Sequence, residues 1–312
     1  MPPRIVTVDT PAPAVRLIYD FVSPAEESYI IEKVSAVGGD SSKLWGWKEL
    51  NGRRSMYWGG TVTPSATLIP APFPSFMDSA WPNVLERITD TGAFDVFGVD
   101  AKGKKKAPNH CLVNEYLPGQ GIMAHTDGPA YSPLVSTLSL GSHSILTLRP
   151  RRSHTNPSTS NSTSPPTELT PEPSTSTTLP PLTAPSPPNA DDPPPLSIFL
   201  PARSLILLSE ELYSDWMHGI EADIKLDTMD SLRACANWES FWEAGGGMLD
   251  ELMGSAGGEV GSGSTPMDKK QAIEALVARR RIAEAGQGWE RGTRLSLTCR
   301  RVDKVRKGIK LG

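Results

Sequence analysis

The composition of the chain changes abruptly between Pro150 and Pro195, and this break constrains every fold that the sequence can adopt. Ser, Thr, Pro and acidic residues dominate the segment, and they bury too little apolar surface to offset the entropy of ordering. We therefore expect residues 150–195 to be disordered. Short apolar strands are predicted on both sides, so the segment is interpreted as an insertion within one folded core.

Outside this segment the sequence predicts a mainly β fold with flanking helices (α+β). Ser23 followed by Pro24 and Glu26 is typical of a helix start. Further helices are expected at 81–89 and 267–285. The predicted strands are 15–22, 109–116, 136–140, 143–148, 196–200, 204–208 and 293–302, with 136–140 and 143–148 expected to form a hairpin. Many short strands with few helices indicate a sandwich or barrel.

Charge and cysteine content exclude several classes of protein. A net charge of −4 argues against a strongly basic nucleic-acid-coating protein, although residues 102–106 form a local basic run. Three cysteines without close spacing argue against a disulfide framework or a zinc knuckle. With no signal peptide or membrane span predicted, we expect a soluble protein of the cytoplasm or nucleus without a membrane partner.

A candidate metal site is formed by His125, Asp127 and His218. Residues two apart on a strand face the same way, so His125 and Asp127 can reach one metal. Two imidazoles and one carboxylate suit non-haem Fe(II) with open coordination positions. Taken alone, a His-x-Asp triplet arises often by chance, and a single histidine such as His218 is more commonly a core or helix-terminal residue.

The last predicted strand carries a polar face made of Arg294, Ser296, Thr298 and Arg300. This face is either wet, as on many half-buried strands, or it points into a barrel, where an arginine could bind a carboxylate bidentately. Asn114 and Tyr116 form a second polar pair on one strand face, and they offer a carboxamide and a phenol to the same ligand.

These motifs, in this order, resemble those of the AlkB family of Fe(II)/2-oxoglutarate dioxygenases. The resemblance covers residues 109–148, 196–218 and 291–302, and it is weaker before residue 100. It implies a double-stranded β-helix, or jelly-roll barrel, and a reaction that uses Fe(II), 2-oxoglutarate and O2. The residues implied to ligate iron are His125, Asp127 and His218. Those implied to bind 2-oxoglutarate are Arg294 with Asn114, Tyr116 and Ser296, and Arg300 near the metal-binding end.

The interval of 93 residues from His125 to His218 is longer than is usual in this family, and omitting 150–195 reduces it to 47. A second insertion, 224–287, separates His218 from Arg294, and long insertions cost little closure entropy. We therefore expect an N-terminal segment (1–106) with a substrate lid, an interrupted dioxygenase core (107–304) and a basic tail (305–312).

The resemblance implies oxidation, and on an N-methyl group demethylation, of an alkylated nucleic acid by a monomeric enzyme. The lid segment offers Trp47 and Tyr57 for stacking on a base and Arg53 and Arg54 for phosphate. The aromatic residues are equally interpreted as packing residues, and Lys102–Lys106 as a solvated loop. The same chemistry on a protein or small molecule, and a low-activity binding or scaffold protein, stay open as alternatives.

Overall fold

The computed structural model describes residues 5–8, 15–38, 46–151, 194–241 and 288–306. The predicted disordered segment lies almost wholly outside the described residues, as does the predicted helix 267–285. Within them, the elements are β1 Ile5–Val8, β2 Val15–Ile18, α1 Pro24–Gly38, β3 Lys48–Leu50, β4 Arg53–Trp58, β5 Gly60–Val62, β6 Leu68–Pro70, α2 Ser75–Asp78, α3 Val84–Asp90, η1 Ala93–Phe97, β7 His110–Tyr116, β8 Ile122–His125, β9 Leu134–Leu140, β10 Ser144–Pro150, β11 Leu196–Leu200, β12 Leu205–Ser209, α4 Glu211–Ser214, β13 Trp216–Ile220, β14 Leu226–Asp227, α5 Met229–Arg233, β15 Trp289–Glu290 and β16 Arg294–Arg300.

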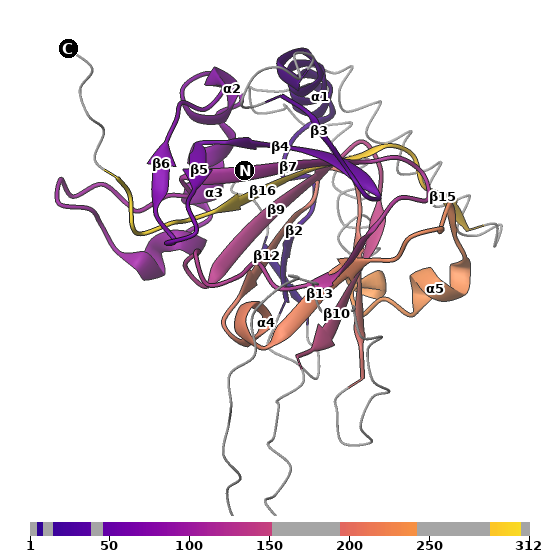
Figure 1. The fold of residues 1–312 in the computed structure, drawn as a ribbon. Helices are drawn as coiled ribbons and strands as arrows, with labels where there is room; N and C mark the ends of the chain where they lie inside the picture. The colour runs from indigo at the N-terminus through magenta and orange to yellow at the C-terminus, as the bar shows by residue number, and fades with distance from the viewer. Residues whose placement is uncertain (1–4, 9–14, 39–45, 152–193, 242–287, 307–312) are drawn as a thin grey trace, which may run out of the picture.

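Two main sheets form the centre of the molecule (Figure 1). The larger has the strand order β1-β2-β12-β9-β16-β7-β4-β3, and the smaller has the order β11-β10-β13-β8. One apolar cluster joins them, with Tyr116 and Ile206 from the larger sheet and Leu148, Ile198 and Trp216 from the smaller. The two sheets therefore pack face to face, as the predicted jelly roll requires. No described strand belongs to both, so their hydrogen bonds do not close into a barrel.

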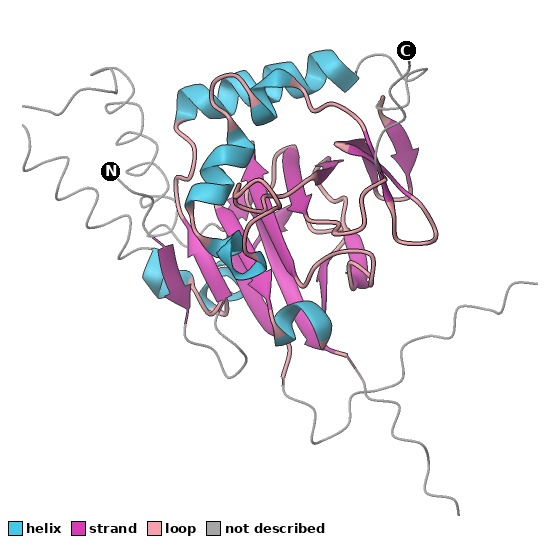
Figure 2. Ribbon diagram, turned by 90° about the vertical axis from the view of Figure 1, so that its left-hand side faces the viewer, coloured by secondary structure: helices cyan, strands magenta, loops and turns pink. Residues whose placement is uncertain are grey.

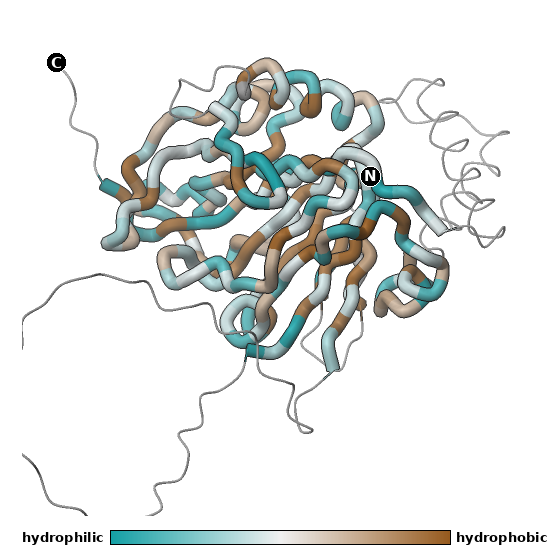
Figure 3. Tube along the Cα trace, turned by 45° about the vertical axis from the view of Figure 1, so that its right-hand side comes forward, coloured by the Kyte–Doolittle hydropathy of each residue, from teal (hydrophilic) through white to brown (hydrophobic). Residues whose placement is uncertain are grey.

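Helices cover the outer side of the larger sheet (Figure 2). Ile30 and Val34 of α1 and Ile88 of α3 are fully or almost fully buried in a second cluster, with Leu297 and Cys299 of β16. The apolar face of β16 thus packs outward against helices, which leaves its polar face toward the smaller sheet. Along the chain, brown apolar segments concentrate in the central strands (Figure 3).

Helix α1 begins where the sequence predicts. The Ser23 N–H donates to Glu26 Oε2 over 2.7 Å, and the Glu26 N–H donates to Ser23 Oγ over 3.3 Å. This reciprocal pair satisfies two backbone donors at the start of the helix. The predicted helix 81–89 begins later, at Val84, because Asn83 has a left-handed backbone with φ 52°.

The predicted hairpin between residues 136–140 and 143–148 is wrong. β9 pairs with β12 and β16 in the larger sheet, whereas β10 pairs with β11 and β13 in the smaller sheet. The connection crosses from one sheet to the other at Gly141, where φ is +79° and a Cβ would lie 2.6 Å from the Thr293 carbonyl oxygen. A glycine here marks a change of sheet rather than a two-residue turn.

Two segments that were predicted as separate from the core also contribute to it. In the N-terminal segment, β2 pairs with β12 and β4 pairs with β7. In the stretch predicted as irregular from residue 224, α5 and the following turn bury Leu232 and Trp238 against Phe199 of β11. Among the described residues, no helix is long and apolar enough to cross a membrane.

Candidate metal and co-substrate site

The structure brings His125, Asp127 and His218 together between the two sheets. His125 ends β8 and lies directly opposite His218 of β13 in the strand register, with ring centroids 4.5 Å apart. One ligand atom from each of the three residues lies within 4.8 Å of the others. In the part of the chain that the structure describes, this is the only such group of histidine, cysteine and carboxylate side chains.

The approach of the two histidine strands depends on Gly219. A Cβ at this position would lie 2.9 Å from backbone atoms of Ile122 and Ala124. The register of β8 and β13 also shifts between His218 and Ile220. A larger residue would therefore push β8 away from β13 and separate the imidazoles.

Asp127 lies in a loop and not on the strand that the sequence predicts for it. Strand β8 ends at His125, so Asp127 lies in the following loop and does not share a strand face with it. Its Oδ1 accepts a hydrogen bond of 2.6 Å from Arg300 Nη1. Its Oδ2 is buried 4.0 Å from His218 Nε2 and accepts no hydrogen bond from the described residues. A buried carboxylate oxygen without a donor fits a bound cation.

The surroundings of both imidazoles suit metal ligation. Burial lowers the pKa of His218 from 6.5 to about 4, opposed by the Asp127 carboxylate, while His125 and Arg300 lower it further. His125 Nδ1 lies 2.9 Å from the Met123 carbonyl oxygen, which can only accept a hydrogen bond. Nδ1 therefore donates to this carbonyl oxygen, which leaves Nε2 as the ring nitrogen of His125 that can ligate a metal.

A buried cation lies deeper between the sheets. Arg294 is 4% exposed, and its Nη2 donates to Ser139 Oγ over 2.8 Å, whereas its Nε has no hydrogen-bond partner in the part of the chain that the structure describes. Desolvation lowers the pKa of Arg294 from 12.5 to about 10. No carboxylate of the described residues forms an ion pair with this guanidinium, so the donor set fits an anionic ligand.

The other predicted co-substrate residues surround Arg294 through strand register. Tyr116 lies opposite Arg294, and Asn114 lies opposite Ser296, where β7 pairs with β16. Tyr116, Asn114 and Ser296 are all buried, and the guanidinium of Arg294 lies 5.6 Å from the Tyr116 ring centroid. The polar face of β16 is thus buried rather than wet.

Three residues of this site were not singled out from the sequence. Ser139 holds Arg294, and its position on the polar face of predicted strand 136–140 is the one signal for it. The Tyr131 ring lies 4.2 Å from the Arg300 guanidinium, and Tyr213 Oη donates to the Gly128 carbonyl oxygen over 3.0 Å. Burial, together with Asp127, raises the pKa of Tyr213 to about 12. These tyrosines pack the loop that carries Asp127, a tertiary contact that the sequence does not reveal.

The structure separates the four predicted lid residues. Trp47 is 8% exposed in the helix-side core and packs against Arg54, whose Nε lies 2.7 Å from Glu115. Trp47 therefore takes part in packing, the alternative to base stacking, and Arg54, predicted for phosphate, forms an ion pair with Glu115. Arg53 Nε donates to Asn114 Oδ1 over 3.3 Å. Tyr57 is 42% exposed and stacks on His110, with centroids 5.5 Å apart.

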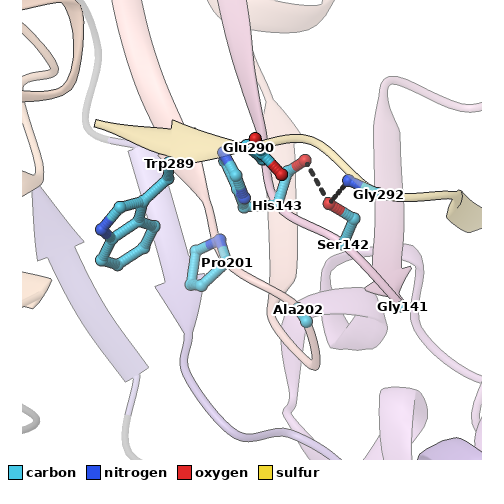
Figure 4. Close-up of a pocket in the computed structure, with 8 residues that line it drawn as sticks. All are labelled: Gly141, Ser142, His143, Pro201, Ala202, Trp289, Glu290 and Gly292. Carbon is cyan, nitrogen blue, oxygen red and sulfur yellow. Dashed lines mark hydrogen bonds between the residues drawn. The ribbon is translucent and has the colours of Figure 1, made fainter. Parts of the chain in front are cut away.

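A separate cavity of about 250 Å³ lies near the start of β16, whereas Asp127 pairs with Arg300 at the strand's other end. In Figure 4, the Ser142 hydroxyl lies between the His143 carbonyl oxygen and the Gly292 N–H. His143 Nε2 lies 3.0 Å from Asp227, a carboxylate that also accepts two hydrogen bonds from Arg291. This cavity contains none of the candidate iron ligands.

The class of protein follows from sequence comparison. The sequence profile of the 2OG-Fe(II) oxygenase superfamily matches residues 15–300, which is most of the chain. The protein therefore belongs to this superfamily. It is a 2-oxoglutarate-dependent dioxygenase whose cofactors are Fe(II), 2-oxoglutarate and O2.

Individual relatives place the chain within the AlkB family. It is 31% identical over 208 residues to "Probable RNA/DNA demethylase ALKBH6" of Danio rerio, covering 67% of this chain and 69% of that protein. The motifs around Asn114, His125 and Arg294 are most like those of the sixth AlkB homologue of animals and plants, and this match confirms that resemblance.

Two solved structures are also similar. OsALKBH1 aligns with a TM-score of 0.43 at 13% identity, over 94% of this chain and 100% of its own. An oxidoreductase of the 2OG-Fe(II) oxygenase family from Burkholderia pseudomallei aligns with a TM-score of 0.39 at 10% identity, over 94% of this chain and 88% of its own.

Proposed function

We propose that this protein demethylates alkylated nucleic acid, with His125, Asp127 and His218 as its iron ligands. One observation carries the proposal. The His125/Asp127/His218 cluster and the buried guanidinium of Arg294 lie between the same two sheets. Among the described residues, Asp127 Oδ2 has no hydrogen-bond donor and the Arg294 guanidinium has no carboxylate partner. An iron(II) ion and a dicarboxylate are the pair of ligands that would fill these two positions.

Arg294 would hold the far carboxylate of 2-oxoglutarate, with Tyr116, Asn114 and Ser296 around it. Arg300 would orient Asp127 and face the metal-binding end of the co-substrate. When bound, Fe(II) and 2-oxoglutarate supply O2-dependent hydroxylation of a substrate C–H bond, coupled to decarboxylation of 2-oxoglutarate to succinate. The residues of the chain orient these groups and exclude water.

On an N-methyl group, hydroxylation gives a hemiaminal that releases formaldehyde and leaves the N–H form of the base. Two observations favour this substrate. The relative named above carries RNA/DNA demethylase in its name. In addition, Tyr57 presents an exposed ring on His110, which lies 5.7 Å from Tyr131 beside Arg300, and exposed aromatic rings suit base stacking. Because all of the site residues lie on one chain, the proposal takes the enzyme to act as a monomer.

Formaldehyde and succinate release tests the proposal. The protein is supplied with Fe(II), 2-oxoglutarate and a panel of N-methylated DNA and RNA oligonucleotides, with His125→Ala as the control variant. We expect equal amounts of the two products with at least one oligonucleotide and none with the variant. Succinate without formaldehyde across the panel would contradict the nucleic-acid substrate and favour a protein or small molecule. Absence of both products would favour a scaffold role.

A further inference from the structure

A rigid basic hairpin precedes β7. The backbone of Val99 forms an antiparallel bridge with Lys105, and the Lys106 N–H donates to the Gly98 carbonyl oxygen over 3.0 Å. The carboxylate of Asp100 accepts hydrogen bonds from the N–H groups of Lys102 and Lys104, at 2.8 and 2.9 Å. The turn is therefore fixed by backbone hydrogen bonds and by the Asp100 carboxylate, and the side chains of Lys102 and Lys104 are exposed.

The hairpin carries more positive than negative charge, because Asp100 is the one carboxylate within residues 98–106 and it lies near both Lys102 and Lys104. Lys105 forms an ion pair of 2.9 Å with Asp95, whereas no described carboxylate forms an ion pair with Lys102, Lys104 or Lys106. Lys102 and Lys104 are exposed, and Lys106 is half-buried. The whole chain has a net charge of −4, whereas this run is positively charged. A polyanion would therefore be attracted to the hairpin rather than to the surface as a whole.

The chain that follows the hairpin is hydrogen-bonded to the residues directly after Arg300. Asn109 Nδ2 donates to the Val302 carbonyl oxygen over 2.8 Å, and Arg301 Nη1 donates to the Ala107 carbonyl oxygen over 3.0 Å. The next residue is His110, which stacks on the exposed ring of Tyr57. Four residues of extended chain span roughly 13 Å, so Lys106 lies within this distance of His110.

We propose that Lys102, Lys104 and Lys106 bind backbone phosphates of a single-stranded nucleic acid beyond the nucleotide that enters the site. The inference rests on the proposed nucleic-acid substrate and adds to it a preference for strands of several nucleotides. Lysine suits this role because it acts as a mobile point charge that follows a flexible backbone without reading sequence. The exposed Tyr57 ring would stack on a base of the same strand.

The salt dependence of binding tests this surface. The probe is a fluorescein-labelled, unmodified 12-nucleotide single strand, and anisotropy is measured between 50 and 200 mM NaCl. The test variant is Lys102→Gln/Lys104→Gln/Lys106→Gln. A matched variant, Lys33→Gln/Lys225→Gln/Arg233→Gln, removes the same formal charge elsewhere. Lys33 lies in α1, Lys225 directly precedes β14, and Arg233 lies in α5. Three lost phosphate contacts reduce the slope of log affinity against log salt by about 2.

We expect the hairpin variant to bind roughly tenfold or more weakly at 50 mM NaCl and to show the smaller slope, while the matched variant behaves as wild type. Equal slopes in all three proteins, or no binding of the strand by wild type, would overturn the inference. Formaldehyde assays separate it from the proposed function. If the hairpin variant loses binding as expected but wild type releases no formaldehyde from any oligonucleotide, the surface stands and the demethylase proposal fails.

Discussion

Arg300 and Asp127 form an ion pair of 2.6 Å, and both side chains are 5% exposed although the residues lie 173 positions apart. The pair leaves the other carboxylate oxygen of Asp127 without a donor among the described residues, 4.0 Å from His218 Nε2. Arg300 therefore fixes the orientation of a candidate metal ligand. Side chains that orient a metal ligand typically contribute a factor of about 10–100 to metal affinity.

Arg300→Met is accordingly expected to weaken Fe(II) binding by about 10- to 100-fold, because Asp127 loses the one hydrogen-bond donor that it has among the described residues. An anaerobic titration with Fe(II), monitored by isothermal titration calorimetry, measures the change in affinity. Arg301→Met, which removes the neighbouring arginine that pairs with exposed Asp303, serves as the control and is expected to stay within about twofold of wild type. Wild-type affinity in Arg300→Met would refute the orienting role.

Arg294→Met is expected to abolish 2-oxoglutarate binding without lowering the stability of the unliganded protein. A buried guanidinium without a carboxylate partner costs desolvation energy, so methionine should leave the melting temperature equal to or above that of the unliganded wild type. Millimolar 2-oxoglutarate should raise the melting temperature of wild type but not of the variant. Differential scanning fluorimetry with Fe(II) measures both effects, and a retained ligand shift in Arg294→Met would argue against the assignment.

The stability of the metal-free protein should fall between pH 7 and pH 5, in part because of His110. Burial, followed by the charge of Arg300, lowers the pKa of His110 from 6.5 to about 4. As the pH falls through 6.5, the unfolded chain gains a proton that the folded chain does not take up until about pH 4. Stability is therefore lost across this window, and the His110 contribution at pH 5 is about 2 kcal/mol.

His110→Phe retains a ring for Tyr57 to stack on and cannot titrate. Urea unfolding at both pH values should therefore show a decrease that is about 2 kcal/mol smaller in the variant than in wild type. Identical pH dependence in the two proteins would mean that His110 is not buried in its neutral form.

Asp227→Asn tests the network beside the separate cavity. Asp227 and Arg291 are 2% and 6% exposed, so the variant leaves Arg291 buried without its counter-charge and should lose about 3–5 kcal/mol of stability. The control is Asp95→Asn in the exposed pair with Lys105, where the loss should stay below about 1 kcal/mol. Urea denaturation at neutral pH compares them, and equal losses would contradict the buried-pair account.

Much of the fold and the candidate site follows from local pattern. The alternation along residues 294–300 predicts both the apolar face that packs on α1 and α3 and the polar face that surrounds the buried guanidinium. The helix start at Ser23 is confirmed because a capping box depends on residues three apart. In both cases, the information lies within a few residues of sequence.

Features that depend on tertiary contact were not predictable in this way. The change of sheet at Gly141 has the sequence of a hairpin turn, and only pairing with distant β12 and β11 distinguishes the two. The aromatic and basic side chains around residues 47–57 predict a substrate lid, but Trp47 is buried in the helix-side core and Arg54 pairs with Glu115. A strand pattern identifies which side chains share a face, not which sheet or partner covers that face.

The number of Fe(II) ions bound per chain tests the central claim most directly. Under anaerobic conditions, with excess Fe(II) removed by desalting, metal analysis should find about one ion in wild type and in the control His110→Phe. It should find almost none in His125→Ala, Asp127→Ala or His218→Ala, with circular dichroism showing that each variant is folded. One tightly held ion in any of these three folded variants would contradict the assignment of that residue as an iron ligand.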